Sequence, residues 1–430
     1  MYLKGSKWSM NRRRTRPNWF RIILLSLLVL GGAYLNRFVI PNQPQFGVPT
    51  PTPTRAPESF ITEAQEYFAQ GKLIPAIASY KEALASNPND PAVYVALARV
   101  QVFAGQYKDA QSSAESALLL SNDNSMAHAV LAWALDFQEQ YVEAESSITR
   151  ALELDPNNAI AHAYHVEILV DAAANDLGPI NAIEQAIEES KVAISLDPNA
   201  LETRRARGYI LENTNNFEEA IREYEEAIKI NANIADLHLA LGRNYRLLGA
   251  YDKAITSFTD ANALNPEDPL PDLFLSRTYA TIGKYAQAMQ HAETSVDNRP
   301  SDTNLRGNLG VMYYRNAYFE DAIRELGYVI KGGLTEEGLQ MELINLTPNA
   351  PRIAEYYFTY GLALSRVNQC GEALQIAQTI LARIPTDELA VEQANAIVSR
   401  CQQNLVETPV PLPTSSEPAP VSTEVSTPTP

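Results

Sequence analysis

The chain has 430 residues, 46% of them hydrophobic, and a formal net charge of −17. The charge is unevenly spread, because residues 1–40 contain eight Lys or Arg and no acid, which leaves 26 basic against 51 acidic residues in the rest. Such an acidic body lacks the basic footprint that nucleic-acid binding requires. Two cysteines are too few for a disulfide-dense scaffold or a Cys-rich zinc site.

The first 40 residues have the pattern of a membrane-targeting segment. A basic stretch, 1–18, precedes an apolar run, and the interval 19–40 has about the length that a helix needs to cross a bilayer. This pattern predicts a cytoplasmic tail over 1–18 and a transmembrane signal anchor over 19–40, with everything after it outside the cytoplasm. The alternative is a signal peptide cleaved near Gly31-Gly32-Ala33, which would release a secreted protein.

Two further segments are rich in proline. Residues 41–56 alternate Pro and Thr, which favours extended polyproline II and predicts a semi-rigid spacer. Residues 406–430 combine Pro, Ser and Thr without apolar periodicity. They cannot offset the entropy lost on ordering, so a disordered tail is predicted.

Between these segments the chain is repetitive, and Ala235–Asp268 shows the unit most clearly. Apolar residues recur at helical spacing in two series, which Gly249 separates. Asn265-Pro266 ends the second series, because a residue before proline is disfavoured in a helix. The unit is therefore predicted to be two short amphipathic helices joined by a tight turn.

The same pattern returns every 34 residues, and its small and aromatic positions resemble the tetratricopeptide (TPR) repeat. The fourth copy is longer than the others, and residues 334–353 interrupt the period with a partly extended, partly loop-like segment. A final amphipathic helix, 388–405, would cap the array. The nine predicted copies are 57–90, 91–124, 125–158, 159–200, 201–234, 235–268, 269–302, 303–336 and 354–387.

The resemblance implies an all-α fold, a TPR-type α-solenoid in which helix-turn-helix repeats stack into a right-handed superhelix. It also implies that the first helix of each copy lines an inner groove, where the family usually binds peptides. Carried over copy by copy, this groove would change from aromatic to arginine-rich along the chain. The predicted partner groove includes Trp133, Phe137, Arg205, Tyr209, Arg243, Arg246, Arg277, Tyr314 and Arg315.

Arginines gathered on one surface of an acidic body predict a site for carboxylates, because guanidinium binds them bidentately. The alternative is that these arginines pair with nearby acids such as Glu202, Glu212 or Asp236. The Lys and Asn set of the carboxylate clamp of chaperone-binding TPR domains is absent from the sequence. Recognition of a chaperone C-terminus is therefore not predicted.

No sequence motif of an enzyme active site is present. The chain lacks a Gly-rich phosphate loop, HExxH, GxSxG and CxxC, and repeats occupy every stretch long enough for a catalytic domain. We therefore predict no enzymatic activity, no cofactor, and no catalytic or metal site. His162 and His165, near Glu167, resemble metal ligands. However, His162 shares a repeat column with His128 and His238 that packs between helices in TPR proteins, so packing is the favoured interpretation.

Cys370 and Cys401 are candidates for a disulfide. In the TPR frame, Cys370 lies in the turn of the ninth copy and Cys401 lies near the end of the capping helix. In stacked TPR units these two places are neighbours, and outside the cytoplasm the pair could form a bridge that clamps the cap. The alternative is two separate free thiols.

The leading functional hypothesis is a non-enzymatic, membrane-anchored scaffold whose extracytoplasmic groove binds a protein or peptide. The alternative is a secreted or surface protein that binds an acidic polysaccharide through the same arginines, with aromatic rings such as Trp133 as stacking platforms. An enzyme subunit is a distant third. The sequence names neither the partner nor the oligomeric state.

Overall fold

The structure, a computed structural model, describes residues 18–34, 37 and 55–407, which fall into two units, 1–55 and 56–430. In the first unit, helix α1 spans Trp19–Tyr34 and has 16 residues. A bilayer core requires about 20 apolar residues in a helix. No helix of the described residues is both long and apolar enough to cross a membrane, so the predicted span over 19–40 is not supported.

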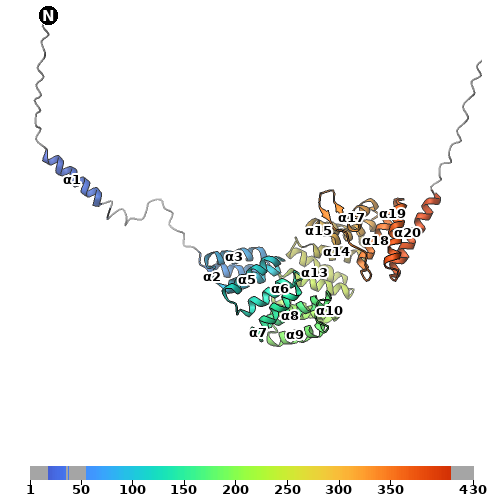
Figure 1. The fold of residues 1–430 in the computed structure, drawn as a ribbon, viewed down its shortest axis with the longest axis horizontal. Coiled ribbons are helices and arrows are strands. Elements are labelled where there is room, and N and C mark those ends of the chain that lie inside the picture. The colour runs from blue at the N-terminus through green and yellow to red at the C-terminus, as the bar shows by residue number, and fades with distance from the viewer. Residues whose placement is uncertain (1–17, 35–36, 38–54, 408–430) are drawn as a thin grey trace, which may run out of the picture. The chain divides into compact units, whose positions relative to one another are not determined.

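The second unit is a series of helix pairs followed by one last helix (Figure 1). A two-stranded antiparallel ladder, β1 (Gly333–Leu334) with β2 (Gln340–Met341), interrupts the series. The helices are α2 (Pro57–Ala69), α3 (Leu73–Ser86), α4 (Pro91–Phe103), α5 (Tyr107–Leu120), α6 (Ser125–Asp136), α7 (Tyr141–Leu154), α8 (Ala159–Ala174), α9 (Ala182–Leu196), α10 (Leu201–Asn213), α11 (Phe217–Ile230), α12 (Ala235–Leu247), α13 (Tyr251–Leu264), α14 (Pro269–Thr281), α15 (Tyr285–Asn298), α16 (Thr303–Arg315), α17 (Phe319–Lys331), α18 (Pro351–Arg366), α19 (Cys370–Arg383) and α20 (Glu388–Glu407).

Short polar signals set where these helices begin and end. Asp90 and Asp302, for example, accept hydrogen bonds from the first backbone N–H groups of α4 and α16, as N-cap residues do. The turn inside a pair needs one residue with positive φ, which is glycine in several copies, such as Gly249 at φ 73°. In other copies Asn215 or Asn368 adopts this conformation, which asparagine tolerates better than most residues.

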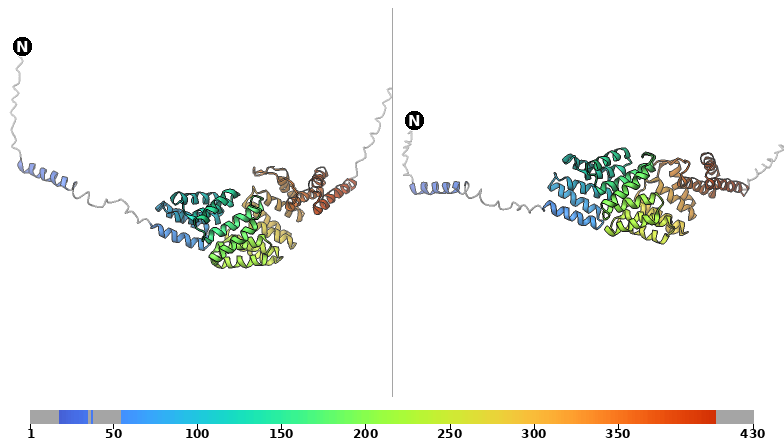
Figure 2. Two further views of the ribbon diagram at one scale, coloured as in Figure 1. Left: turned by 60° about the horizontal axis from the view of Figure 1, so that its bottom comes forward. Right: turned by 90° about the horizontal axis from the view of Figure 1, so that it is seen from below.

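Small residues allow the two helices of a pair to approach closely. An added Cβ at Gly242 would lie 2.5 Å from the Phe258 ring, and one at Gly208 would lie 2.8 Å from Tyr224. Fully buried alanines such as Ala254 and Ala261 line the same contact. Consecutive pairs then stack side by side, as Figure 2 shows, so that each pair buries its remaining apolar face against the next.

The two irregular stretches of the sequence have distinct structures. In the fourth copy, α8 has 16 residues and a turn over 175–181 precedes α9. Residues 333–341 form the β1–β2 hairpin, and an irregular segment leads from it to α18. The prediction of an all-α solenoid is confirmed for the described repeat unit, in which these short strands are the one departure. Residues 1–17 of the predicted tail 1–18, residues 35–36 and 38–40 of the predicted anchor, most of the 41–56 spacer and residues 408–430 of the predicted 406–430 tail lie outside the described residues.

Candidate functional site

The first part of the array closes on itself. Two side chains of the turn before α12 reach back to the end of α2: Asn233 Nδ2 donates to the Ala69 carbonyl at 2.8 Å, and Asn231 Nδ2 to that of Phe68 at 3.5 Å. On the inner side, Arg99 Nε from α4 donates to Glu202 Oε1 from α10 at 2.6 Å. Elements more than a hundred residues apart in the sequence are thereby joined.

Aromatic side chains fill the space that this closure encloses. Trp133 is only 1% exposed and stacks on Tyr164, with ring centroids 4.3 Å apart. Phe103 and Phe137 meet its ring edge-on, at 5.0 and 5.8 Å. The expectation that Trp133 is an accessible groove residue is therefore corrected: the aromatic end of the predicted groove is a packed interior.

Arg205 enters this interior from α10 and is neutralised there. Its guanidinium binds the buried carboxylate of Glu167, lies 5.3 Å from the Trp133 ring centre, and donates through Nε to Asp236 at 2.9 Å. Trp133 Nε1 donates to the same Glu167 at 2.8 Å. Burial raises the pKa of Glu167 to about 7 although Arg205 opposes the shift. These groups satisfy one another and offer little to a ligand.

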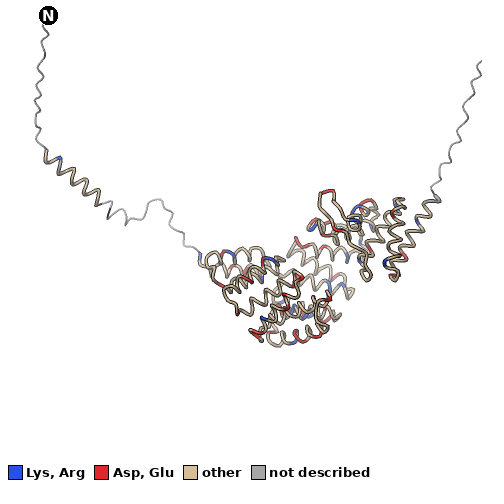
Figure 3. The backbone as a smooth tube through the Cα atoms, viewed as in Figure 1, with Lys and Arg blue, Asp and Glu red and all other residues tan. Residues whose placement is uncertain are grey.

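The next predicted groove residues are also occupied. Arg243 donates to both oxygens of Glu212, at 2.9 and 3.2 Å, and the Tyr209 hydroxyl donates to Asp171. For Arg205 and Arg243, the structure therefore shows pairing with Asp236 and Glu212. The expected free arginine surface does not include these two side chains. Figure 3 shows how acidic and basic residues are interspersed along the array.

Asp136 is a buried carboxyl group that lies beside the half-buried carboxyl group of Asp171. Asp136 is 2% exposed and neither of its oxygens receives a hydrogen bond. Burial, then the charges of Asp171 and Glu167, raise the pKa of Asp136 to about 9. The carboxyl is therefore protonated at neutral pH, and as a neutral acid it has an O–H to donate towards Asp171.

The histidines have structural partners. In one repeat column the side chain contacts the carbonyl six residues earlier, in the turn between copies, so the column ties each first helix to that turn. The contacts are His128–Asn122 (3.0 Å), His162–Pro156 (3.0 Å), Arg204–Pro198 (2.8 Å), His238–Ala232 (2.9 Å) and Arg306–Pro300 (2.7 Å).

His165 lies beside this column in an ionic cluster. Its Nε2 atom lies 3.3 Å from a carboxylate oxygen of Glu145, and its Nδ1 atom lies 3.5 Å from one of Glu189. Burial alone would lower the pKa of His165, but the two carboxylates outweigh it and raise the pKa to about 9. His162 also binds Glu189. Within the described residues, no group of His, Cys, Asp and Glu has the arrangement of a metal site.

The inner surface changes character from α12 onwards. Arg246 on α12 and Arg277 on α14 are half-buried, and their guanidinium carbons lie 5.8 and 6.0 Å from the ring centre of Phe274. Among the described residues, no carboxylate pairs with either arginine, and the Nε atom of each is buried without a hydrogen-bond partner. Two of the nine predicted groove residues thus form an uncompensated basic pair.

Farther along, α16, α18 and α20 line an open cavity of about 660 Å³, whose surface is mostly apolar. Two predicted groove residues, Tyr314 and Arg315, line it, and Arg315 pairs with Glu355 at 3.2 Å. The other lining residues are Val311, Pro351, Arg352, Glu355, Phe358, Thr359, Leu362, Leu389 and Gln393.

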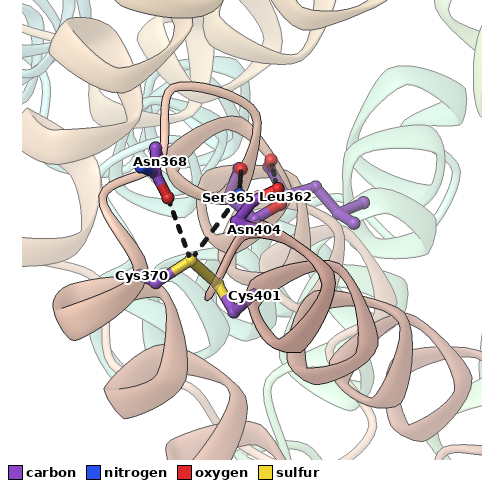
Figure 4. The surroundings of a disulfide bond; sticks show 6 residues. All are labelled: Leu362, Ser365, Asn368, Cys370, Cys401 and Asn404. Carbon is purple, nitrogen blue, oxygen red and sulfur yellow. Dashed lines mark hydrogen bonds between the residues drawn. A yellow bond between two sulfur atoms is a disulfide. The ribbon is translucent and has the colours of Figure 1, made fainter. Parts of the chain in front are cut away.

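A disulfide joins Cys370 at the start of α19 to Cys401 in α20, with the Cα atoms 5.4 Å apart (Figure 4). Asn404, one turn after Cys401, donates to the Ser365 carbonyl of α18 at 2.9 Å and lies 3.8 Å from the Cys370 sulfur. The bridge therefore fastens α20, which forms one wall of the cavity, to the last helix pair.

Sequence reasoning missed Phe274 and Arg352. Phe274 occupies a repeat position that Ala206 and Ala240 hold in the two preceding copies. The large ring at a position that is otherwise small could have indicated this site from the sequence. Arg352 lies in the segment that breaks the period, where the repeat frame assigns no inner face. Their contribution depends on how α12, α14 and α18 come together, which a period of 34 residues does not specify.

Replacing Asp136 by asparagine should make stability less dependent on pH. A carboxyl whose pKa is raised on folding contributes stability at low pH, and this is lost as the pH rises from about 4 through about 9. The asparagine amide cannot ionise and keeps a donor towards Asp171. Between pH 5 and pH 8.5, the free energy of unfolding measured in urea should therefore shift by about 4–5 kcal/mol in favour of Asp136→Asn relative to the wild type. Parallel pH profiles would contradict the assignment.

Reducing the disulfide should loosen α20 selectively. A bridge over a loop of this size contributes about 2–4 kcal/mol, and within the described residues no later helix packs against α20. In the variant with Cys370→Ser and Cys401→Ser, amide hydrogen exchange should accelerate in α20 at least about tenfold. Exchange in α6 and α8 is the internal control and should not change. Equal protection of α20 in both proteins would show that the bridge does not secure it.

Comparison with known families agrees with this architecture. Three tetratricopeptide repeat models match residues 67–134, 127–158 and 181–269. No curated protein matches the sequence. The number of nine copies and the membrane anchor stay predictions.

Several solved structures are similar in part. One is the type IV pilus biogenesis factor PilW (20% identity, TM-score 0.42, covering 48% of this chain and 91% of that one). Another is a tetratricopeptide repeat protein from Parabacteroides merdae (14% identity, TM-score 0.43, covering 64% of this chain and 99% of that one). A third is yeast Tom70 (14% identity, TM-score 0.40, covering 81% of this chain and 96% of that one). At these values no property of those proteins transfers to this chain. The family models and the stacked helix pairs together support a tetratricopeptide repeat protein.

Proposed function

We propose that this chain is a non-enzymatic protein-interaction scaffold whose partner binds the cavity between α16, α18 and α20. The observation that carries the proposal is the cavity itself, about 660 Å³ in volume and lined by consecutive inner helices. Tetratricopeptide repeat proteins are generally scaffolds of this kind. The inner side from α2 to α12 is occupied by its own aromatic and ionic side chains, so it leaves little room for a partner.

The lining fits an apolar anchor with polar flanks. Phe358, Leu362 and Leu389 supply apolar surface, and Leu389 is 56% exposed. Arg315 and Glu355 pair with each other at the rim. Interfaces commonly have this arrangement, an apolar centre that buries an anchor side chain and a polar rim that excludes water from it.

An acidic polysaccharide is the second candidate, and the structure weakens its main argument. The sugar-stacking platform that the sequence offered was Trp133, which is buried against Tyr164 and bonded to Glu167. Planar aromatic surface at a sugar site must be accessible, so Trp133 cannot serve. Binding of an acidic polysaccharide is one of the outcomes that the affinity experiment below distinguishes.

We also propose that the array functions outside the cytoplasm. Two observations support this location: the basic stretch followed by an apolar run in residues 1–40, and the Cys370–Cys401 bridge, since disulfides persist mainly in oxidising compartments. Anchoring through residues 19–40, or release after cleavage there, belongs to the same proposal. A single mature N-terminus mapped by mass spectrometry decides between the two.

Site-specific photo-crosslinking in the native cells tests the cavity. A benzophenone amino acid at Gln393, inside the cavity, should trap a discrete partner, whereas the same group at Leu119, 88% exposed and outside it, should not. Leu389→Arg places a charge on the apolar wall and should reduce the Gln393 product about fivefold or more without lowering the melting temperature. Identical products at both positions, or a product that Leu389→Arg leaves unchanged, would contradict the proposal.

A further inference from the structure

Arg246 and Arg277 differ from the other arginines of the inner surface. Arg99, Arg205 and Arg243 each bind a carboxylate of a neighbouring helix, respectively Glu202, Glu167 and Glu212. In the described part of the chain, Arg246 and Arg277 have no such partner. In a protein of net charge −17, acidic residues are abundant, so two inner arginines without a carboxylate partner are unexpected.

The surroundings of Arg246 and Arg277 make their two positive charges energetically unfavourable. Both guanidinium groups lie against Phe274, and both side chains are half-buried, so water solvates their charges incompletely. Arg352, exposed at the start of α18, adds a third positive charge within electrostatic reach. Burial, followed by the charge of Arg352, lowers the pKa of both Arg246 and Arg277. Like charges held together without a counter-charge destabilise the fold that holds them.

Bound anions relieve this repulsion. Guanidinium offers a planar fork of N–H donors that matches the two oxygens of a carboxylate, and the bond is stronger where water is partly excluded. The Nε atoms of Arg246 and Arg277 are buried without a partner, so a carboxylate would bind through the terminal Nη groups of these half-buried side chains. Phe274 lies beside both guanidinium groups, and Arg277 also hydrogen-bonds Tyr356. Neither the ring nor a neutral hydroxyl neutralises a positive charge, so both arginines keep theirs for a ligand.

We propose that Arg246, Arg277 and Arg352 form an anion site that takes adjacent carboxylates of an acidic peptide segment. This rests on the proposed function, because the segment would belong to the partner held in the neighbouring cavity. Arg352 connects the two places, since it lines the cavity and lies within reach of both other arginines. The partner segment would therefore carry glutamates or aspartates next to an apolar side chain.

A peptide fits this arrangement better than a polysaccharide. The cavity beside Arg352 is lined mainly by aliphatic and aromatic side chains such as Leu362 and Phe358, which suit an apolar amino-acid side chain. A polyuronate would bring carboxylates but no apolar group to fill that space. Phe274, the ring nearest to the basic pair, is covered by guanidinium groups and so is not open to stacking by a sugar.

The test measures the affinity of the full chain, kept in mild detergent, for the fluorescent hexapeptide EELEEL, with QQLQQL as the neutral control. Arg246→Gln and Arg277→Gln should each weaken EELEEL binding about tenfold, and added salt should weaken it in the wild type. Removal of a repelled charge should leave the melting temperature unchanged or raised. Arg243→Gln, one turn away on α12, breaks a bound pair and should lower the melting temperature while affinity stays within about twofold.

The outcomes separate a binding role from a structural one. Loss of EELEEL binding in Arg246→Gln and Arg277→Gln without loss of stability supports the site. Equal affinity in all variants, no EELEEL binding by the wild type, or a drop in stability like that of Arg243→Gln would overturn it. Arginine-dependent binding of an alginate oligomer in place of the peptide would overturn the choice of a peptide.

Failure of this inference and failure of the proposed function are distinguishable. A partner trapped at Gln393 together with no EELEEL binding would reject the anion site alone. EELEEL binding that depends on Arg246 and Arg277, with no cavity-specific product at Gln393, would reject the scaffold function of the cavity alone.

Discussion

The buried contact between Arg205 and Glu167 is the constraint on which the first part of the array depends. It places a guanidinium and a carboxylate beside Trp133 in the space that a repeat coil would otherwise leave as a groove. Burying two charges is unfavourable unless each is paired and further hydrogen-bonded, and here Asp236 and Trp133 supply the additional bonds. Once this network forms, α6, α8, α10 and α12 are held in one arrangement and their inner side is occupied.

The inner surface has two parts, which differ in whether its arginines are paired with carboxylates. Arg99, Arg205 and Arg243 each have a carboxylate on the adjacent helix or across the closed coil, so their charge is neutralised internally. At Arg246 and Arg277 the accompanying residues are Phe274 and another arginine, so charge is left for a ligand. The disulfide then fixes α20 beside the cavity, which keeps one wall of the proposed binding surface in place.

Sequence periodicity predicted the helix pairs well because each pair is a local structure: Gly242 against Phe258 and N-caps such as Asp302 act within one copy. It named the acids Glu202, Glu212 and Asp236 as possible partners of the inner arginines. It did not predict that Arg99 contacts Glu202 across the closed coil, or that Trp133 is buried. Both features depend on the angle between one helix pair and the next, which adds up over several copies. A repeat pattern carries no direct information about that sum.

A double-mutant cycle on Arg205 and Glu167 tests this account most directly. With Trp8 and Trp19 replaced by Phe, Trp133 becomes the single fluorescent reporter of the interior during urea unfolding. Arg205→Met and Glu167→Leu should each lower the free energy of unfolding by about 3–5 kcal/mol, because each removes one member of the buried pair and leaves the other with a single partner, Trp133 for Glu167 and Asp236 for Arg205. The double variant should lose much less than the sum, with a coupling energy of about 2 kcal/mol or more. Additive losses would show that the two side chains do not meet, and would contradict the closed, self-filled coil.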